Sequence, residues 1–169
     1  AYSGAGAAGS VAIGSGAEVH ADHCISIGHN AVVNGPSVGT TIAMGWNVTV
    51  PASSTRVIVL HTGSSFTVPG SSTNLIALGR DNTITAGLPD LTVVGHDNTI
   101  YGASDLIAIG RQSTVGAAGT DFDLIGMGHD VIVSGQSSVS IGHNSSAVGD
   151  QAVALGDTAA ARKLTVSVG

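Results

Sequence analysis

A five-residue motif that recurs along the whole chain constrains the fold more than any other feature. It has the form x-Φ-small-Φ-Gly, where Φ is an apolar residue, and its eleven copies end 13 to 18 residues apart. A repeat of this length is typical of a solenoid, in which each repeat forms one coil that packs on its neighbours. The copies end at Gly14, Gly28, Gly45, His61, Gly79, Gly95, Gly110, Gly128, Gly142, Gly156 and Gly169.

Each coil is predicted to contain two short strands. The motif alternates with period two, which indicates a strand, and no helical periodicity of 3.6 residues lasts for eleven residues. A second alternation follows each glycine and places an apolar or small residue five positions after it, such as Val19, Ile100 and Val115. We predict an all-β solenoid of about eleven coils of about 15 residues. Its core would hold the residues three and one positions before the glycine, such as Ile107 and Ile109.

The distribution of charge predicts that the solenoid is covered on one side. None of the 16 charged residues falls inside a motif copy, and the face opposite the predicted core is small or apolar. A strand that is apolar on both faces is normally buried on both. We therefore expect a homo-oligomer, although this argument does not give the number of chains. The candidate interface residues are Ala12, Ala43, Leu75, Ala77, Leu91, Val93, Leu106, Ala108 and Leu124.

The composition excludes several classes of protein. Hydrophobic residues make up 43% and charged residues 9% of the chain, the reverse of a disordered protein. No apolar run is long enough for a membrane-spanning helix. The one cysteine excludes an internal disulfide and a cysteine-based metal site. A net charge of −6 with five Lys and Arg residues argues against nucleic acid and anionic membranes as partners.

The motif copies closely resemble the head repeats of trimeric autotransporter adhesins, the YadA-like head family. The resemblance rests on SVAIGSGAEV at 10–19, CISIGHNAVV at 24–33 and AVALGDTAAA at 152–161, and it extends over residues 10–169. It implies one head domain over 1–169, a left-handed parallel β-roll that assembles as a homotrimer. Residues 157–169 resemble the last head coil, which leads into the neck.

The same resemblance implies a function and a location. The expected function is non-enzymatic adhesion to host extracellular matrix proteins or cell-surface glycans, with the roles in virulence and hemagglutination that such adhesins have. The expected location is the bacterial cell surface, as part of an outer-membrane protein. Because the N-terminus has no basic segment followed by a long apolar one, we expect an internal fragment without signal peptide or anchor.

The position directly after the motif glycine is the candidate ligand-facing position. A column of polar turn residues is the simpler interpretation, because Asn or Asp often follows and stabilises such turns. Binding is the alternative, since histidine titrates near neutral pH and Trp and Arg are common anchors of interfaces. The candidate residues are His29, Trp46, Arg80, His96, Arg111, His129 and His143.

Three other motifs are interpreted as structural, and we predict no catalytic, cofactor or metal site. Gly4–Gly9 fits G-x-G-x-x-G but lacks the preceding strand and following helix of a dinucleotide site. Gly35–Gly39 fits G-x-S-x-G, but Pro36 and the next motif favour an outer loop. His20, Asp22, His23 and Cys24 have metal-binding chemistry, yet alternate residues of an extended segment point to opposite sides.

Two other functions are alternatives to adhesion. A hexapeptide-type β-helix acyltransferase is also a trimer, but its apolar residues recur every six positions, and this spacing is not present. A phage tail-fibre or spike segment can use similar trimeric rolls. Only the neck-like segment at Thr165–Gly169 favours the adhesin over the phage protein.

Overall fold

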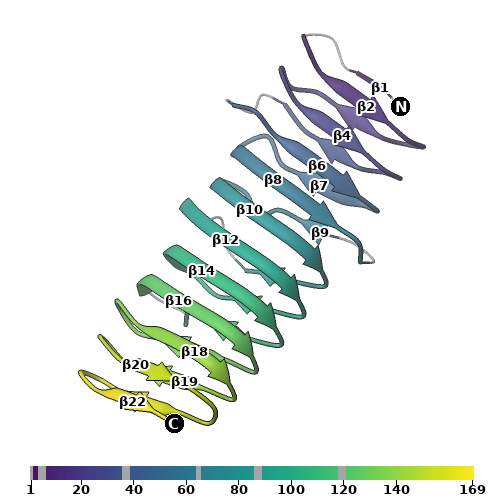
Figure 1. Cartoon of the computed structure of the whole chain (residues 1–169). Coiled ribbons are helices and arrows are strands. Elements are labelled where there is room, and N and C mark those ends of the chain that lie inside the picture. The colour runs from purple at the N-terminus through teal and green to yellow at the C-terminus, as the bar shows by residue number, and fades with distance from the viewer. Residues whose placement is uncertain (1, 4–6, 36–38, 64–65, 86–88, 118–120) are drawn as a thin grey trace. The chain divides into compact units, whose positions relative to one another are not determined.

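The protein, in a computed structural model, is a parallel β-solenoid of about nine turns. The structure describes residues 2–3, 7–35, 39–63, 66–85, 89–117 and 121–169, and none of these is helical (Figure 1). The all-β solenoid is therefore confirmed, with somewhat fewer turns than the eleven coils predicted. None of the described residues forms a helix of the length and apolar character needed to cross a lipid bilayer.

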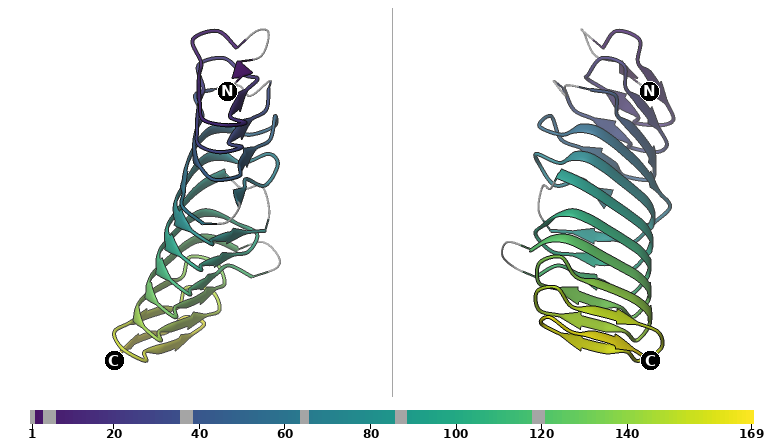
Figure 2. Two further views of the ribbon diagram at one scale, coloured as in Figure 1. Left: turned by 90° about the vertical axis from the view of Figure 1, so that its right-hand side faces the viewer. Right: turned by 60° about the vertical axis from the view of Figure 1, so that its left-hand side comes forward.

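The chain divides into two compact units, and each contains two parallel sheets. The first unit comprises residues 1–81 with 86–89, and the second comprises 82–85 with 90–169. In each unit one sheet is made of the strands that carry the motif, here called the motif sheet. The other sheet is made of the strands that follow the motif glycine, here called the return sheet. Within the second unit the two sheets form two layers (Figure 2).

The strands follow the order that the repeat predicts. In the first unit, the motif strands are β2 (Val11–Ile13), β4 (Ile25–Ile27), β6 (Ile42–Gly45), β8 (Thr55–His61) and β10 (Thr73–Arg80). Its return strands are β1 (Tyr2–Ser3), β3 (Glu18–Val19), β5 (Val32–Val33), β7 (Val48–Val50) and β9 (Phe66–Thr67).

In the second unit, the motif strands are β12 (Pro89–His96), β14 (Ala103–Arg111), β16 (Asp121–His129), β18 (Val139–His143), β20 (Val153–Leu155) and β22 (Val166–Val168). Its return strands are β11 (Thr83–Ile84), β13 (Thr99–Ile100), β15 (Thr114–Val115), β17 (Ile132–Ser134), β19 (Ser146–Val148) and β21 (Ala160–Arg162).

Two corners in left-handed backbone geometry bend most coils. One corner precedes the motif by one position and is occupied by residues such as Asp105 (φ 54°) and Asp123 (φ 56°). The other lies at the motif glycine and at the residue two positions after it, as at Gly128 (φ 139°) and Asp130 (φ 54°). Short polar residues tolerate the left-handed region better than most residues do, which explains their recurrence at these positions.

The side chains of the return strands point inward and outward as the sequence predicts. The residue five positions after the motif glycine points into the solenoid in every coil where it was expected to do so. These ten side chains are at most 8% exposed: Val19, Val33, Val50, Phe66, Ile84, Ile100, Val115, Val133, Ala147 and Ala161. The outward positions of the return strands include Thr67 and Thr83, which are exposed.

The side chains of the motif strands point in the opposite directions from those predicted. Eight of the nine candidate interface residues are at most 4% exposed, and these lie inside their own chain: Ala43, Leu75, Ala77, Leu91, Val93, Leu106, Ala108 and Leu124. The ninth, Ala12, is half-buried. Side chains already buried in one chain cannot form the expected wall between chains, so that assignment is wrong.

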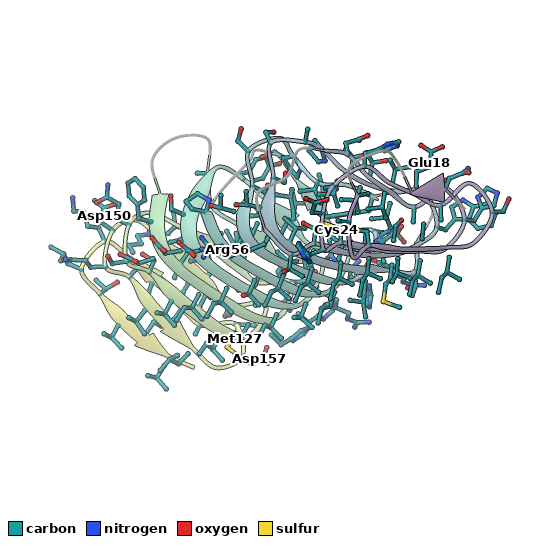
Figure 3. The ribbon with its side chains drawn as sticks, turned by 90° about the horizontal axis from the view of Figure 1, so that it is seen from above. Glu18, Cys24, Arg56, Met127, Asp150 and Asp157 are labelled. Atoms are coloured by element: carbon teal, nitrogen blue, oxygen red, sulfur yellow. The ribbon has the colours of Figure 1, made fainter. Side chains whose placement is uncertain are left out.

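The residues predicted to form the core of the motif strands point outward instead. Met127, labelled in Figure 3, is one of them and is half-buried. Nine of these large apolar side chains are between 36% and 76% exposed: Val11, Ile13, Leu60, Ile76, Ile107, Ile109, Ile141, Val166 and Val168.

The small space between the two sheets explains the reversal. A Cβ atom placed on Gly126, an inward position of β16, would lie 2.7 Å from Cγ2 of Val115 and 3.2 Å from Cγ2 of Val133. Valines of the return strands therefore fill the space that faces this motif position. Since interiors are close-packed, small residues fit opposite these valines and larger ones do not.

Candidate functional site

The turn at the motif glycine holds the next residue at the edge of the motif sheet. At Gly128 a Cβ atom would overlap the carbonyl oxygen of Gly142 in the next coil, and the backbone has a φ of 139°. Only glycine satisfies both conditions without strain. Two positions later, Asn or Asp adopts a left-handed conformation, as the turn interpretation expects: Asn30, Asn47, Asp81, Asp97, Asp130 and Asn144.

In the second unit this turn brings four candidate residues into one column. The parallel register pairs His96 with Arg111, Arg111 with His129, and His129 with His143. Nδ1 of His96 lies 2.9 Å from a carboxylate oxygen of Asp97. Their common position in the repeat therefore makes these four residues neighbours in space.

The two histidines at the end of this column form the most closely connected part of it. The rings of His129 and His143 stack with centroids 5.1 Å apart and an interplanar angle of 20°. His129, His143 and Asp130 form a group whose possible metal-ligand atoms lie within 4.8 Å of one another. The sequence prediction included both histidines but missed Asp130, although Gly-His-Asp at 128–130 and Gly-His-Asn at 142–144 carried a signal for it.

In the first unit the candidate residues form a shorter cluster. The rings of His29 and Trp46 stack with centroids 4.3 Å apart and an interplanar angle of 18°. Nδ2 of Asn30 donates to Oδ1 of Asn47 at 3.2 Å, directly beside the stacked rings. Trp46 is 53% exposed, so much of its side chain is open to a ligand.

His61 separates Trp46 from Arg80. The register pairs Gly45 with His61 and His61 with Gly79, so one coil lies between the two candidate residues. The side chain of His61 points inward and is 4% exposed, and its ring lies 5.3 Å from the ring of Phe66. Burial lowers the pKa of His61, and the carboxylate of Asp81 raises it by a smaller amount.

The side chains of Cys24, Asp22 and His20, which have metal-binding chemistry, each contact a different partner and do not meet at one point. Cys24, labelled in Figure 3, is fully buried, and its thiol contacts the backbone oxygens of Asp22 and Gly39. A carboxylate oxygen of Asp22 accepts the backbone N–H of Ala8. Nε2 of His20 lies 3.0 Å from a carboxylate oxygen of Glu18.

The two glycine motifs lie partly outside the described residues. Gly4 and Gly6 of the first motif, and Pro36, Ser37 and Val38 of the second, are not described. The strand β2 follows the first motif directly, so a helix does not follow it.

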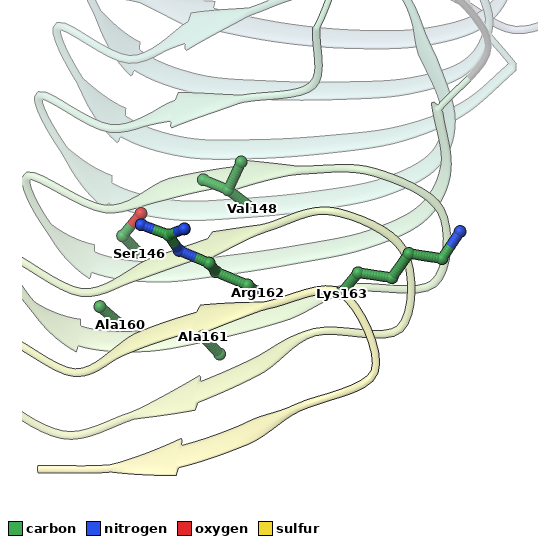
Figure 4. A pocket seen from close by; sticks show the side chains of 6 residues that line it. All are labelled: Ser146, Val148, Ala160, Ala161, Arg162 and Lys163. Carbon is green, nitrogen blue, oxygen red and sulfur yellow. The ribbon is translucent and has the colours of Figure 1, made fainter.

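A groove of about 510 Å³ lies on the outer face of the return sheet in the second unit. Ser146, Val148 and Arg162 line it, and Arg162 extends toward Ser146 while Lys163 points away (Figure 4). The backbone N–H of Gln136 and the ammonium group of Lys163 lower the pKa of Asp150. The sequence prediction did not include this groove.

The described residues form an all-β repeat fold, and its second unit carries a column of histidine and arginine side chains at the edge of the motif sheet. Residues 134–159 match the family model of the YadA head domain repeat, with two copies. Two copies of this repeat therefore lie within residues 134–159, in agreement with the resemblance found in the sequence motifs. No curated protein matches the chain.

Proposed function

We propose that the chain is part of the head of a homotrimeric adhesin on the bacterial surface, which attaches the cell to host matrix proteins or cell-surface glycans. The proposal is for a left-handed roll with no enzymatic activity. The match of residues 134–159 to YadA head repeats supports it, because this family implies trimers and adhesion.

One observation carries the proposal: the outward face of the motif sheet is apolar. In the second unit Ile107 and Ile109 are 39% and 36% exposed, and in the first unit Ile13 is 55% exposed. None of the 16 charged residues lies in a motif copy, so no charge interrupts this face within a motif. Large apolar side chains exposed next to one another mark an interaction site. We infer that it packs against the same face of other copies.

The surface proposed to meet the host is formed, in each unit, by the residues that directly follow the motif glycines. Trp46 offers an exposed aromatic ring, and Arg80 and Arg111 offer exposed guanidinium groups. Trp and Arg are the residues most often found as anchors in interfaces. Three chains would present three copies of each weak contact, which raises the overall affinity by multivalency.

Binding of the assembled protein to immobilised collagen, fibronectin, laminin and a glycan array tests this proposal. We expect binding to at least one of them, and we expect the double variant Trp46→Ala and Arg80→Ala to weaken it about tenfold or more. Thr83→Ala, an exposed change on the return sheet, is the matched control and should leave binding unchanged. If the double variant binds as the wild type does, these two residues are not the site, and residues 51–55 and 116–123 would be tested next.

A further inference from the structure

We propose a divalent metal site of the zinc type at the end of the column in the second unit, formed by His129, His143 and Asp130. The proposal goes beyond adhesion and does not depend on it, because the three side chains belong to one chain. Zinc is bound by imidazole nitrogens and carboxylate oxygens in tetrahedral geometry, and a site with three protein ligands leaves one position for water.

The distances of the cluster suit such an ion. Nε2 of His129 lies 3.1 Å from Oδ2 of Asp130. Two ligands about 2.1 Å from a tetrahedral ion lie about 3.4 Å apart, so this pair is already close to the required separation. The third ligand atom, from His143, lies within 4.8 Å of the other two. The side chain of His143 is 53% exposed, so the surrounding protein leaves space for the small rotation that would close the remaining distance.

The fold holds the two imidazoles side by side before any ion binds. His129 and His143 are register partners on adjacent parallel strands, and their backbones are fixed by the turn at Gly128 and Gly142. Adjacent strands lie about 4.8 Å apart, which sets the spacing of the rings. The rings are accordingly stacked with centroids 5.1 Å apart.

A second carboxylate orients His143. Nδ1 of His143 lies 3.0 Å from Oδ1 of Asp157, which comes from the next coil and is labelled in Figure 3. When a carboxylate accepts the proton of one ring nitrogen, the other nitrogen is left as the ligand, and this arrangement is general among metal-binding histidines. Asp157 therefore leaves Nε2 of His143, which lies 3.4 Å from Nδ2 of Asn144, as the atom that would bind the ion.

Two neighbours of His129 act on the site in opposite ways. Oε1 of Gln112 lies 2.9 Å from Nε2 of His129 and is a further oxygen close to the ion. Nη2 of Arg111 lies 3.5 Å from Nδ1 of His129, and its positive charge opposes a cation there. The proposal thus requires that removal of the Arg111 charge strengthens metal binding.

The same column contains a matched control. His96 also follows a motif glycine, and its Nδ1 lies 2.9 Å from a carboxylate oxygen of Asp97. Its register partner toward the C-terminus is Arg111, not a second histidine. His96 thus has the carboxylate but lacks the second imidazole, so it should not contribute to the site.

Calorimetric titration of the full chain with zinc chloride at neutral pH tests the proposal. We expect one site per chain, and we expect His129→Ala and His143→Ala each to weaken it at least about tenfold. Asp157→Asn should weaken it less, Arg111→Ala should strengthen it, and His96→Ala should leave it unchanged. Imidazole NMR signals of His129 and His143 should shift at one equivalent of zinc, and that of His96 should not.

Equal zinc affinity in the wild type and in His143→Ala would overturn the proposal. The same conclusion follows if Arg111→Ala leaves the affinity unchanged or if His96→Ala weakens binding as much as His129→Ala does. Circular dichroism of each variant confirms that the β-structure is retained, and Asp130→Asn provides a ligand change that does not alter side-chain size. Loss of adhesion has no bearing on these results, so failures of the two proposals are distinguishable.

Discussion

Between Leu91 and Val115 the two sheets present opposite kinds of surface to the outside, whereas later return strands of the second unit also expose Ile132 and Val148. The motif sheet points large aliphatic side chains outward, such as Ile107 and Ile109. The return sheet of the same coils points threonine outward, at Thr99 and Thr114. Both sheets bury their inner faces against each other. In these coils the inward residues therefore form the core of the chain, whereas the outward residues of the motif sheet are the ones that the proposed assembly would bury.

A truncation inside the motif sheet is expected to have the largest effect on stability. Leu106 is 1% exposed, and Leu106→Ala should lower the free energy of unfolding by about 2–5 kcal/mol because it leaves a cavity. Urea unfolding followed by circular dichroism measures this, with Thr114→Ala on the outside of the same coil as the control. Dissociation of the assembly by Leu106→Ala, with an unchanged unfolding free energy, would show that Leu106 faces a partner chain instead.

His61, which stands where most motif copies have glycine, is expected to have a smaller effect on the free energy of unfolding, and this effect depends on pH. His61 is buried and its pKa in the folded chain lies below the ordinary value of 6.5. Below pH 6.5 the unfolded chain takes up a proton that the folded chain does not, so this residue lowers stability as the pH falls. Above that pH its contribution does not change. At low pH the free energy of unfolding is lower by about 1.4 kcal/mol for each unit by which folding lowers the pKa of His61.

The variant His61→Leu isolates this contribution. Its unfolding free energy should fall less than that of the wild type between about pH 7 and about pH 5, where a histidine titrates. Thr83→Leu, an exposed change on the return sheet that removes no titratable group, is the control and should retain the wild-type slope. Parallel pH profiles for His61→Leu and the wild type would show that His61 is accessible to protons in the folded chain.

Spacing along the sequence predicted the coil and the neighbours within the column. The 18-residue interval between Gly110 and Gly128 and the 14-residue interval between Gly128 and Gly142 place Arg111, His129 and His143 side by side. The inward orientation of the return strands was also predictable, because polar and apolar residues alternate there. Thr114 and Val115 show this difference within one strand.

The orientation of the motif strands was not predictable from alternation. Ile107 and Ala108 are both uncharged, so the pattern gives two sets of residues without showing which set lies inside. The rule that larger apolar residues fill the core selected the wrong set here. The inner space is limited by side chains of the opposite sheet, such as Val115 and Val133 near Gly126, and this is a property of packing between distant residues.

The polar contacts at the site were also beyond sequence reasoning. The distance between His143 and Asp157 depends on side-chain rotation at two corners in different coils. His61 is buried, and its backbone does not have the positive φ of the neighbouring motif ends Gly45 and Gly79. Residue types at fixed spacing show which groups can meet, whereas the contacts follow from the local geometry of each turn.

The mass of the chain in solution tests most directly the central claim, that the outward face of the motif sheet joins chains. Sedimentation equilibrium should give three times the 16.5 kDa of one chain for the wild type and for Thr114→Glu. Ile107→Glu should give the mass of a single chain, because it would bury unpaired charges between subunits. A wild type of 16.5 kDa, or an Ile107→Glu variant that assembles normally, would contradict the account.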